Sequence, residues 1–218
     1  MRRLVGGLAA LLCLGGAQAA EIPLYPTGPS EDAAFLRFFN AGAAELRLSA
    51  GNGAGLSLPA GSASDFLTVP AGKPIEGQLA LAGQQQALKV SVAPGEFATV
   101  VGLPEAKGLR LVTVREQPDD FNALKASLAF YSLDPSCAQP GLASAGKNVA
   151  IFKDVADGTA QRRSINPLKL SVQLTCAGAP SGAALDLGQL AAGQRYTVFL
   201  APSAQGPRLF QARDNLAN

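Results

Sequence analysis

The chain has 218 residues, a formal net charge of +2, no Trp and no His. This length allows one large or two small domains. The absence of His excludes Ser-His-Asp and Cys-His catalysis and argues against a zinc hydrolase, because each of these sites uses imidazole. The small net charge gives no long-range field to attract a polyanion, so we do not expect nucleic acid as a partner.

The first 19 residues have the features of a cleaved secretory signal peptide. Arg2-Arg3 gives a positive start, residues 4–14 are mainly apolar, and Ala17-Gln18-Ala19 is a small-x-small end. The apolar run is too short for a permanent membrane span. Cys13 raises the alternative of a lipid anchor, but it lies inside the apolar run and lacks the small residue that normally precedes such a Cys. We therefore expect export and cleavage after Ala19.

The mature chain is formally neutral and keeps two cysteines. Cleavage of the signal peptide removes Arg2 and Arg3 from the 18 basic residues, so 16 basic and 16 acidic residues remain. Cys137 and Cys176 form an even pair in an exported chain, which predicts a disulfide. Closing this loop would stabilise the fold by about 4 kcal/mol on the chain-entropy estimate. Two buried thiols are the alternative, and a metal site is not predicted because two thiols are too few ligands.

A sequence repeat organises the mature chain. Residues 93–116 match residues 191–214 without a gap, and ten of the 24 positions are identical. Each copy has a Gly turn, a short β-branched or aromatic run, a Pro/Gly loop and an alternating run, which predicts a hairpin. A lone hairpin buries too little apolar surface to be stable, so each copy must close a larger sheet in its own half of the chain. Chance similarity of two hairpins is the alternative.

Short alternating or apolar runs separated by turn residues fill the rest of the chain. They predict an all-β protein with two tandem antiparallel β-sandwich domains, Ig-like or jelly-roll-like, after the cleaved signal peptide. We place the N-terminal sandwich at residues 20–117, a polar linker at 118–122 and the C-terminal sandwich at 123–218. Besides the two hairpins, strands are predicted at 34–40, 45–48, 65–69, 77–81, 87–92, 126–132, 145–152, 168–174 and 184–187.

The first of these strands has two different faces. Phe35 and Phe39 point to one side with Arg37 between them, and Leu36 and Phe38 point to the other. The first domain has no Cys pair and must be held by its core. The candidates for that core are Phe35, Phe39, Phe66, Phe97 and the surrounding Leu and Val residues.

Candidate catalytic groups are few, and each has an ordinary structural explanation. Ser62-Ala63-Ser64-Asp65 has no base to activate a hydroxyl and fits a turn before a strand. Asp119-Asp120 lies in the linker, where adjacent side chains diverge. Asp154 and Asp157 resemble a calcium loop only faintly, because the oxygen ligands that should follow are missing. We assign no catalytic, cofactor-binding or metal-binding residue.

Arg162, Arg163 and Asn166 are the candidates for contact with a partner. Two adjacent arginines at a strand entrance can face an acidic partner or an anionic polymer. A solvated loop with local charge balance explains them about as well. A strong sugar-binding platform has weak support, because there is no Trp and there are three Tyr.

Several segments in order, spanning nearly the whole mature chain, resemble the AlgF family of periplasmic accessory proteins for alginate O-acetylation. These segments are Leu24–Pro29, Ala34–Ala41, Ser64-Asp65-Phe66, Pro70-Ala71-Gly72 and Ile165–Lys169. The resemblance implies two β-sandwich domains, a periplasmic location, no catalysis and no cofactor. It also implies an adaptor that binds periplasmic or membrane-anchored polysaccharide O-acetyltransferases and, as a further partner, the polysaccharide itself.

Three alternatives stay open. The protein is a pair of carbohydrate-binding modules that holds the polymer, an accessory protein for acetylation of another polymer such as cellulose, or an esterase or transferase with an unconventional site.

Overall fold

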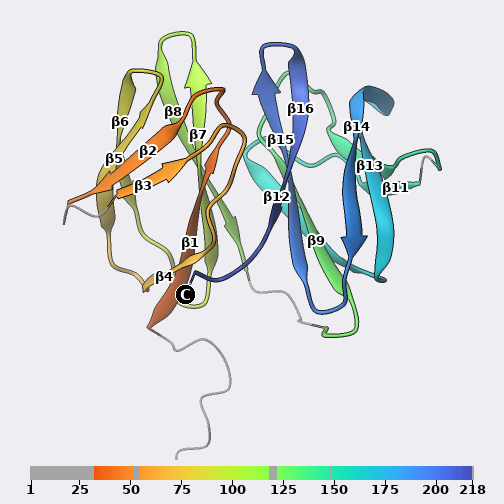
Figure 1. Ribbon diagram of the computed structural model, residues 1–218, viewed down its shortest axis with the longest axis horizontal. Coiled ribbons are helices and arrows are strands. Elements are labelled where there is room, and N and C mark those ends of the chain that lie inside the picture. Colours follow the sequence, from red (N-terminus) through yellow and green to blue (C-terminus); the bar gives the residue numbers. More distant parts are fainter. Residues whose placement is uncertain (1–31, 52–54, 118–121, 148, 218) are drawn as a thin grey trace, which may run out of the picture.

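The computed structural model describes residues 32–51, 55–117, 122–147 and 149–217. These residues form sixteen β-strands in four four-stranded sheets, arranged as two side-by-side lobes (Figure 1). The described part of the chain has no helix long and apolar enough to cross a membrane. The signal peptide at 1–19, its Cys13 and linker residues 118–121 lie outside the described residues.

The first lobe is a sandwich of two sheets, ordered β4-β1-β7-β8 and β3-β2-β5-β6. Its strands are β1 (Ala33–Asn40), β2 (Leu46–Ala50), β3 (Gly55–Leu58), β4 (Leu67–Pro70), β5 (Ile75–Leu81), β6 (Gln84–Val90), β7 (Phe97–Glu105) and β8 (Gly108–Glu116).

The second lobe repeats this arrangement, with sheets ordered β12-β9-β15-β16 and β11-β10-β13-β14. Each strand number is that of its counterpart in the first lobe plus eight, so the two lobes share one topology. The strands are β9 (Ala126–Ser132), β10 (Gly141–Ser144), β11 (Ala150–Phe152), β12 (Thr159–Ile165), β13 (Leu168–Cys176), β14 (Ala179–Leu190), β15 (Arg195–Ser203) and β16 (Gly206–Arg213).

The predicted repeat forms the hairpins β7–β8 and β15–β16, and each closes a sheet of its own lobe. The turns that lead into them match in detail. Gly95 and Gly193 have φ of 70° and 71°, a left-handed conformation that Gly adopts without steric cost. Their N–H groups donate to Ala33 O and Lys125 O, both at 2.8 Å. The sequence similarity therefore reflects equivalent structure.

The predicted all-β class is confirmed, with one addition to the antiparallel pattern. β1 pairs with β7, and β9 with β15, in parallel. Most predicted strands are present, but β3, β10 and β12 were not predicted. The strand predicted at 145–152 is reduced to β11.

Each lobe has its own apolar core between its two sheets. Leu36 and Phe38 enter the first core, as their side of β1 predicts. The prediction that four phenylalanines belong to this core is wrong. They are Phe35, Phe39, Phe66 and Phe97. Phe39 belongs to a separate cluster shared with the second lobe, and Phe97 stacks on Phe35 and meets Phe66 edge-on, outside the first core. The first domain is held by aliphatic residues together with Phe38.

The disulfide prediction is confirmed. Cys137, in the loop after β9, is bonded to Cys176 at the end of β13, across a sequence separation of 39. The bond ties the loop between β9 and β10 to the end of β13. The first lobe has no Cys in its described residues.

Replacing both Cys137 and Cys176 by Ala should lower the free energy of unfolding by up to about 4 kcal/mol, because the unfolded chain loses a covalent loop. Thermal unfolding of the oxidised protein measures this. Under reducing conditions the wild type should fall to the midpoint of the double variant. Equal midpoints in the absence of reductant would contradict the expectation.

Candidate functional site

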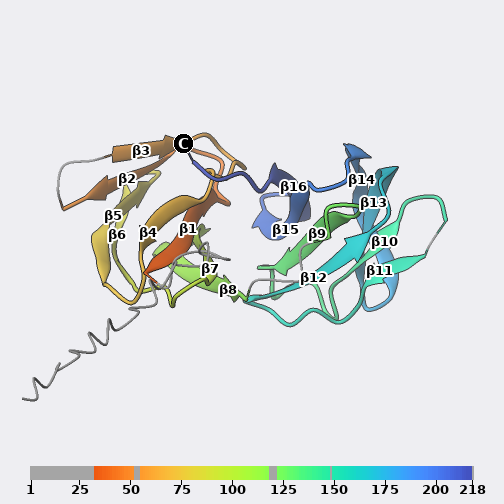
Figure 2. The same cartoon turned by 90° about the horizontal axis from the view of Figure 1, so that it is seen from below.

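The two lobes meet through their facing sheets, β4-β1-β7-β8 and β12-β9-β15-β16 (Figure 2). A third apolar cluster fills this junction, with Phe39 and Val101 from the first lobe and Tyr131 and Phe199 from the second. The rings of Phe39 and Phe199 are stacked with their centroids 4.0 Å apart. The junction is therefore packed like the interior of a domain.

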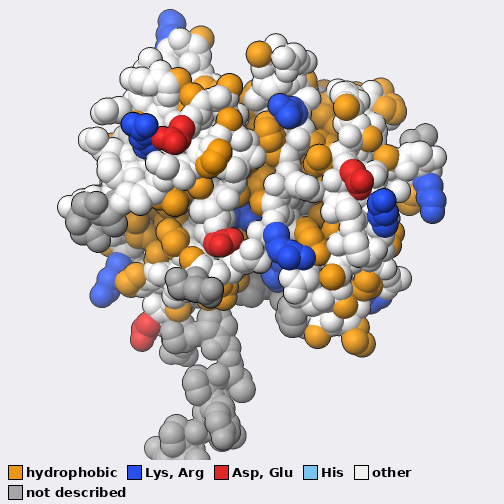
Figure 3. Space-filling view, viewed as in Figure 1, with side chains coloured by type: hydrophobic (Ala, Val, Ile, Leu, Met, Phe, Trp, Pro, Cys, Tyr) orange, Lys and Arg blue, Asp and Glu red, His pale blue; other side chains and the backbone are white. Residues whose placement is uncertain are grey.

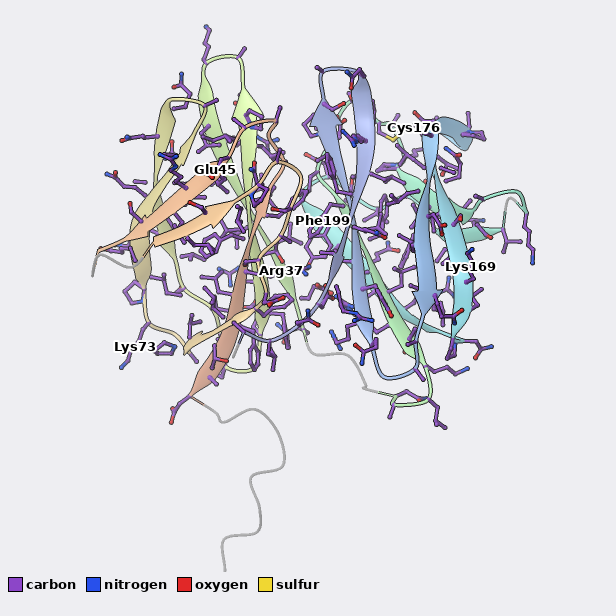
Figure 4. All side chains as sticks on the ribbon, in the orientation of Figure 1. Arg37, Glu45, Lys73, Lys169, Cys176 and Phe199 are labelled. Atoms are coloured by element: carbon purple, nitrogen blue, oxygen red, sulfur yellow. A yellow bond between two sulfur atoms is a disulfide. The ribbon has the colours of Figure 1, made fainter. Side chains whose placement is uncertain are left out.

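A buried arginine crosses the centre of this junction. Arg37 of β1 is fully buried, and its position beside Phe199 is visible in Figure 4. Its Nε donates to Thr99 Oγ1 at 2.9 Å, and one Nη donates to Thr197 Oγ1 at 2.9 Å. The other Nη pairs with Asp214 Oδ1 at 2.6 Å. Thr99 and Thr197 are equivalent positions of the repeat, so the guanidinium joins the same site of both copies.

A second arginine completes a neutral group of four charges. Arg162 of β12 pairs with Glu116 Oε2 and with Asp214 Oδ2, each at 2.7 Å. Glu116 and Asp214 are again equivalent repeat positions. Each lobe thus supplies one Arg and one acid, and Tyr131 also donates to Glu116. Burying this group is tolerable because every charge has an opposite partner.

The surroundings shift the pKa values of these groups. Burial raises the pKa of Asp214, but the nearby charges of Arg37 and Arg162 outweigh it, so the net shift is downward. Burial would lower the pKa of Arg37, but Asp214 and its neighbours raise it overall. Burial raises the pKa of Tyr131, so its hydroxyl stays a donor. Arg37 and Asp214 are therefore both charged at neutral pH.

The C-terminal residues tie the lobes together a second time. Asn215 follows Asp214 and accepts a hydrogen bond from Phe66 N at 2.8 Å, and Ala217 N donates to Phe66 O at 2.8 Å. The end of the second domain thus lies beside the first lobe, close to β4 (Figure 1).

Above the packed junction, the lobes diverge and leave an open groove of about 840 Å³, which we call the junction groove. Hydrophobic side chains gather along the boundary between the lobes in Figure 3. From the first lobe it is lined by Ala41, Gly42, Ala43, Ala60, Gly61 and Pro104. From the second lobe it is lined by Pro202, Ser203, Ala204, Gln205, Arg208 and Phe210.

The groove is suited to binding and not to acid–base chemistry. In the described part of the chain, Arg208 is the single ionisable residue of the lining, and its guanidinium carbon lies 5.1 Å from the ring centre of Phe210. The hydroxyl of Ser203 donates to Gly206 O at 2.8 Å, and the chain has no imidazole to activate it. Gly61 is required at the floor, because a Cβ there would lie 2.6 Å from the Phe210 ring.

The predicted partner-binding residues differ in exposure, with Arg163 and Asn166 exposed and Arg162 largely buried. They lie in or just after β12, which was not predicted as a strand. The side chain of Arg162 is 7% exposed and is held by internal ion pairs. Arg163 is exposed and donates to Ile151 O at 2.6 Å, and exposed Asn166 accepts from Lys125. Contact of Arg163 or Asn166 with a partner stays a prediction.

The residues considered as catalytic or metal-binding candidates are not arranged as such a site in the described part of the chain. Ser64 Oγ accepts from Phe38 N at 3.0 Å and donates to Asp65 O at 2.8 Å. Within the described ranges, no three His, Cys, Asp or Glu side chains gather as a metal site requires. Sequence reasoning missed the roles of Arg37 and Arg208, although the repeat already aligns Arg208 with Arg110.

Replacing Asp214 by Asn should lower the free energy of unfolding by about 3 kcal/mol at pH 7, because two buried guanidinium groups lose a charged partner. The pKa of Asp214 is lowered by folding, so its contribution is present above about pH 4 and is lost as the pH falls below that value. The difference from wild type should therefore shrink in acid.

Urea unfolding across this pH range measures both effects. The control is Glu45→Gln, which removes an exposed pair with Arg47 and should change the free energy by less than about 1 kcal/mol. Equal stability of Asp214→Asn and wild type at pH 7 would contradict a central role for the junction charges.

Comparisons with known proteins agree with the sequence resemblance. A family model described as "Alginate O-acetyl transferase AlgF" matches residues 8–197. The alginate biosynthesis protein AlgF of Pseudomonas aeruginosa is 33% identical over 171 residues, which cover 77% of this chain and 74% of that protein. A crystal structure from Bacteroides uniformis, provisionally named a cell adhesion protein, aligns over 86% of this chain and 99% of its own chain at 11% identity. Its TM-score of 0.29 is too low to show a shared fold. The match of the family model to most of the chain and the identity to the Pseudomonas protein establish that this chain belongs to the AlgF family.

Proposed function

We propose that this protein is a non-catalytic adaptor in alginate O-acetylation, which binds the acetyltransferases that modify the polymer. The observation that carries this proposal is the junction. Two β-sandwiches are locked by a buried apolar cluster and four paired charges, and an open groove remains beside them. A two-domain body that does not flex at its junction and carries an open groove there is suited to hold partners at a fixed spacing.

The chemistry of the chain supports binding over catalysis. The family description contains the word transferase, yet acyl transfer needs a nucleophile with a base, and this chain has no His. Carboxylates are the other source of a base. Among the described residues, buried Glu116 and Asp214 are paired with arginines at the junction, and buried Glu96 is paired with Arg115. Within the same described ranges, buried Asp134 has no arginine partner and accepts hydrogen bonds from Ser136. In the groove, the one hydroxyl side chain has no neighbouring base among the lining residues.

The proposed location is the periplasm. The features of residues 1–19 and the bonded Cys137–Cys176 pair both fit an oxidising exported environment. N-terminal sequencing of the protein from a periplasmic fraction should begin at Ala20. A chain that starts at Met1, or that stays in the cytoplasm, would contradict this location.

Deleting the gene should reduce the acetyl content of the secreted alginate to that of a strain without the acetyltransferase, while polymer synthesis continues. Purified protein should bind at least one purified acetyltransferase of the pathway directly. Polymer with full acetyl content after the deletion would contradict the adaptor function.

Two assays separate the adaptor from the other classes. Purified protein should release no acetyl group from a chromogenic acetyl ester and transfer none from an acetyl donor to oligosaccharide, and turnover in either assay would favour an enzyme. Titration with uronate oligosaccharides should give no saturable binding, and micromolar saturation would favour a polymer-binding module.

A further inference from the structure

An arginine at equivalent positions of the two repeat hairpins has an acidic partner in the first copy and, among the described residues, none in the second. In the first copy, Arg110 pairs with Glu105 at 2.6 Å across the β7–β8 hairpin. In the second copy, Arg208 has the same register in β15–β16, but Ser203 stands at the position of the acid. No carboxylate in the described part of the chain forms an ion pair with Arg208 within 4.0 Å. The charge that is neutralised in the first lobe is therefore uncompensated in the second.

The same change occurs at the other end of the hairpin. Arg115 pairs with Glu96 at 2.7 Å in the first copy. Arg213 occupies the equivalent position in the second copy, where Gln194 replaces the acid and the guanidinium lies 5.7 Å from the Tyr196 ring centre. The second copy thus keeps both arginines of the repeat and has neither acid. The two arginines are five positions apart on β16 and so lie on opposite faces of the strand.

Of these two arginines, only Arg208 lines the junction groove. Around it the lining consists of Ala, Gly and Pro residues, Phe210 and two short polar side chains. Among the described residues, no acidic side chain lines the groove. An occupant that matches this lining has mainly apolar surface and one negative charge.

We infer that the junction groove is the docking site for a segment of an acetyltransferase partner in which one carboxylate, paired with Arg208, is flanked by apolar residues. This assignment rests on the proposed adaptor function. A polyuronate chain fits less well, because it carries a carboxylate on every sugar and many hydroxyl groups. The groove offers one cation and only Ser203 and Gln205 as further polar side chains.

Three matched variants test the assignment. Arg208→Ala removes the cation. Ser203→Glu places an acid where the first copy has Glu105, so the new carboxylate should neutralise Arg208 within the protein. Arg110→Ala is the control, because it removes the equivalent arginine of the β7–β8 hairpin and Arg110 is not among the lining residues of the groove. Arg208 and Arg110 are both surface side chains, so thermal midpoints close to wild type should accompany all three variants.

The probe is the purified periplasmic domain of each acetyltransferase of the pathway, measured by titration calorimetry. Arg208→Ala and Ser203→Glu should each weaken binding by about tenfold or more, and Arg110→Ala by less than about twofold. The affinity of the wild type should fall with added salt more steeply than that of Arg208→Ala, because one ion pair is missing in the variant.

The remaining outcomes are distinct. Equal binding by wild type, Arg208→Ala and Ser203→Glu overturns the groove assignment and leaves the adaptor function standing. Failure of the wild type to bind any of these domains overturns the adaptor function and this assignment with it. Saturable binding of uronate oligosaccharide that Arg208→Ala abolishes makes the polymer the occupant and overturns the assignment to a protein segment.

Discussion

The burial of Arg37 between the two lobes is the constraint on which the rest of the structure depends. A guanidinium cannot leave water without partners for its donors, and here the partners come from both copies of the repeat and from the second lobe's Asp214. Asp214 in turn holds Arg162, which holds Glu116. Separating the lobes would break these ion pairs and also expose the stacked rings of Phe39 and Phe199. The two domains therefore behave as one body.

This constraint explains why the groove has a defined shape. The residues that line it come from both lobes, with the backbone of Gly61 in the first lobe against the ring of Phe210 in the second. Phe210 also meets Phe39 edge-on, which connects the groove to the stacked rings of the junction. A binding surface built across two domains is preorganised only if the domains do not move, and the buried charges supply that condition.

The sequence predicted the elements whose signal is local. Alternation in 34–40 assigned the faces of β1 correctly. The match between residues 93–116 and 191–214 identified the two hairpins. β12 was missed because Gln161-Arg162-Arg163 has the composition of a loop, and only pairing with the buried β9 makes it a strand. Phe39 was assigned to the wrong core because alternation tells which residues share a face, but not that both faces of one sheet are covered.

The junction network could not be predicted, although its members are at equivalent positions of the repeat. Duplication gives each lobe a Thr at one position and an acid at another, but the arginines break the symmetry. In the first lobe, Arg37 of β1 lies opposite Thr99 of β7. In the second lobe, the equivalent register of β9 and β15 places Ala129 opposite Thr197. The arginine of that lobe, Arg162, lies on the neighbouring β12, opposite Ala129. The arginines lie on different strands of the two lobes, yet each pairs with the acid of the other lobe. The divergence of the copies therefore keeps a reciprocal set of opposite charges across the contact.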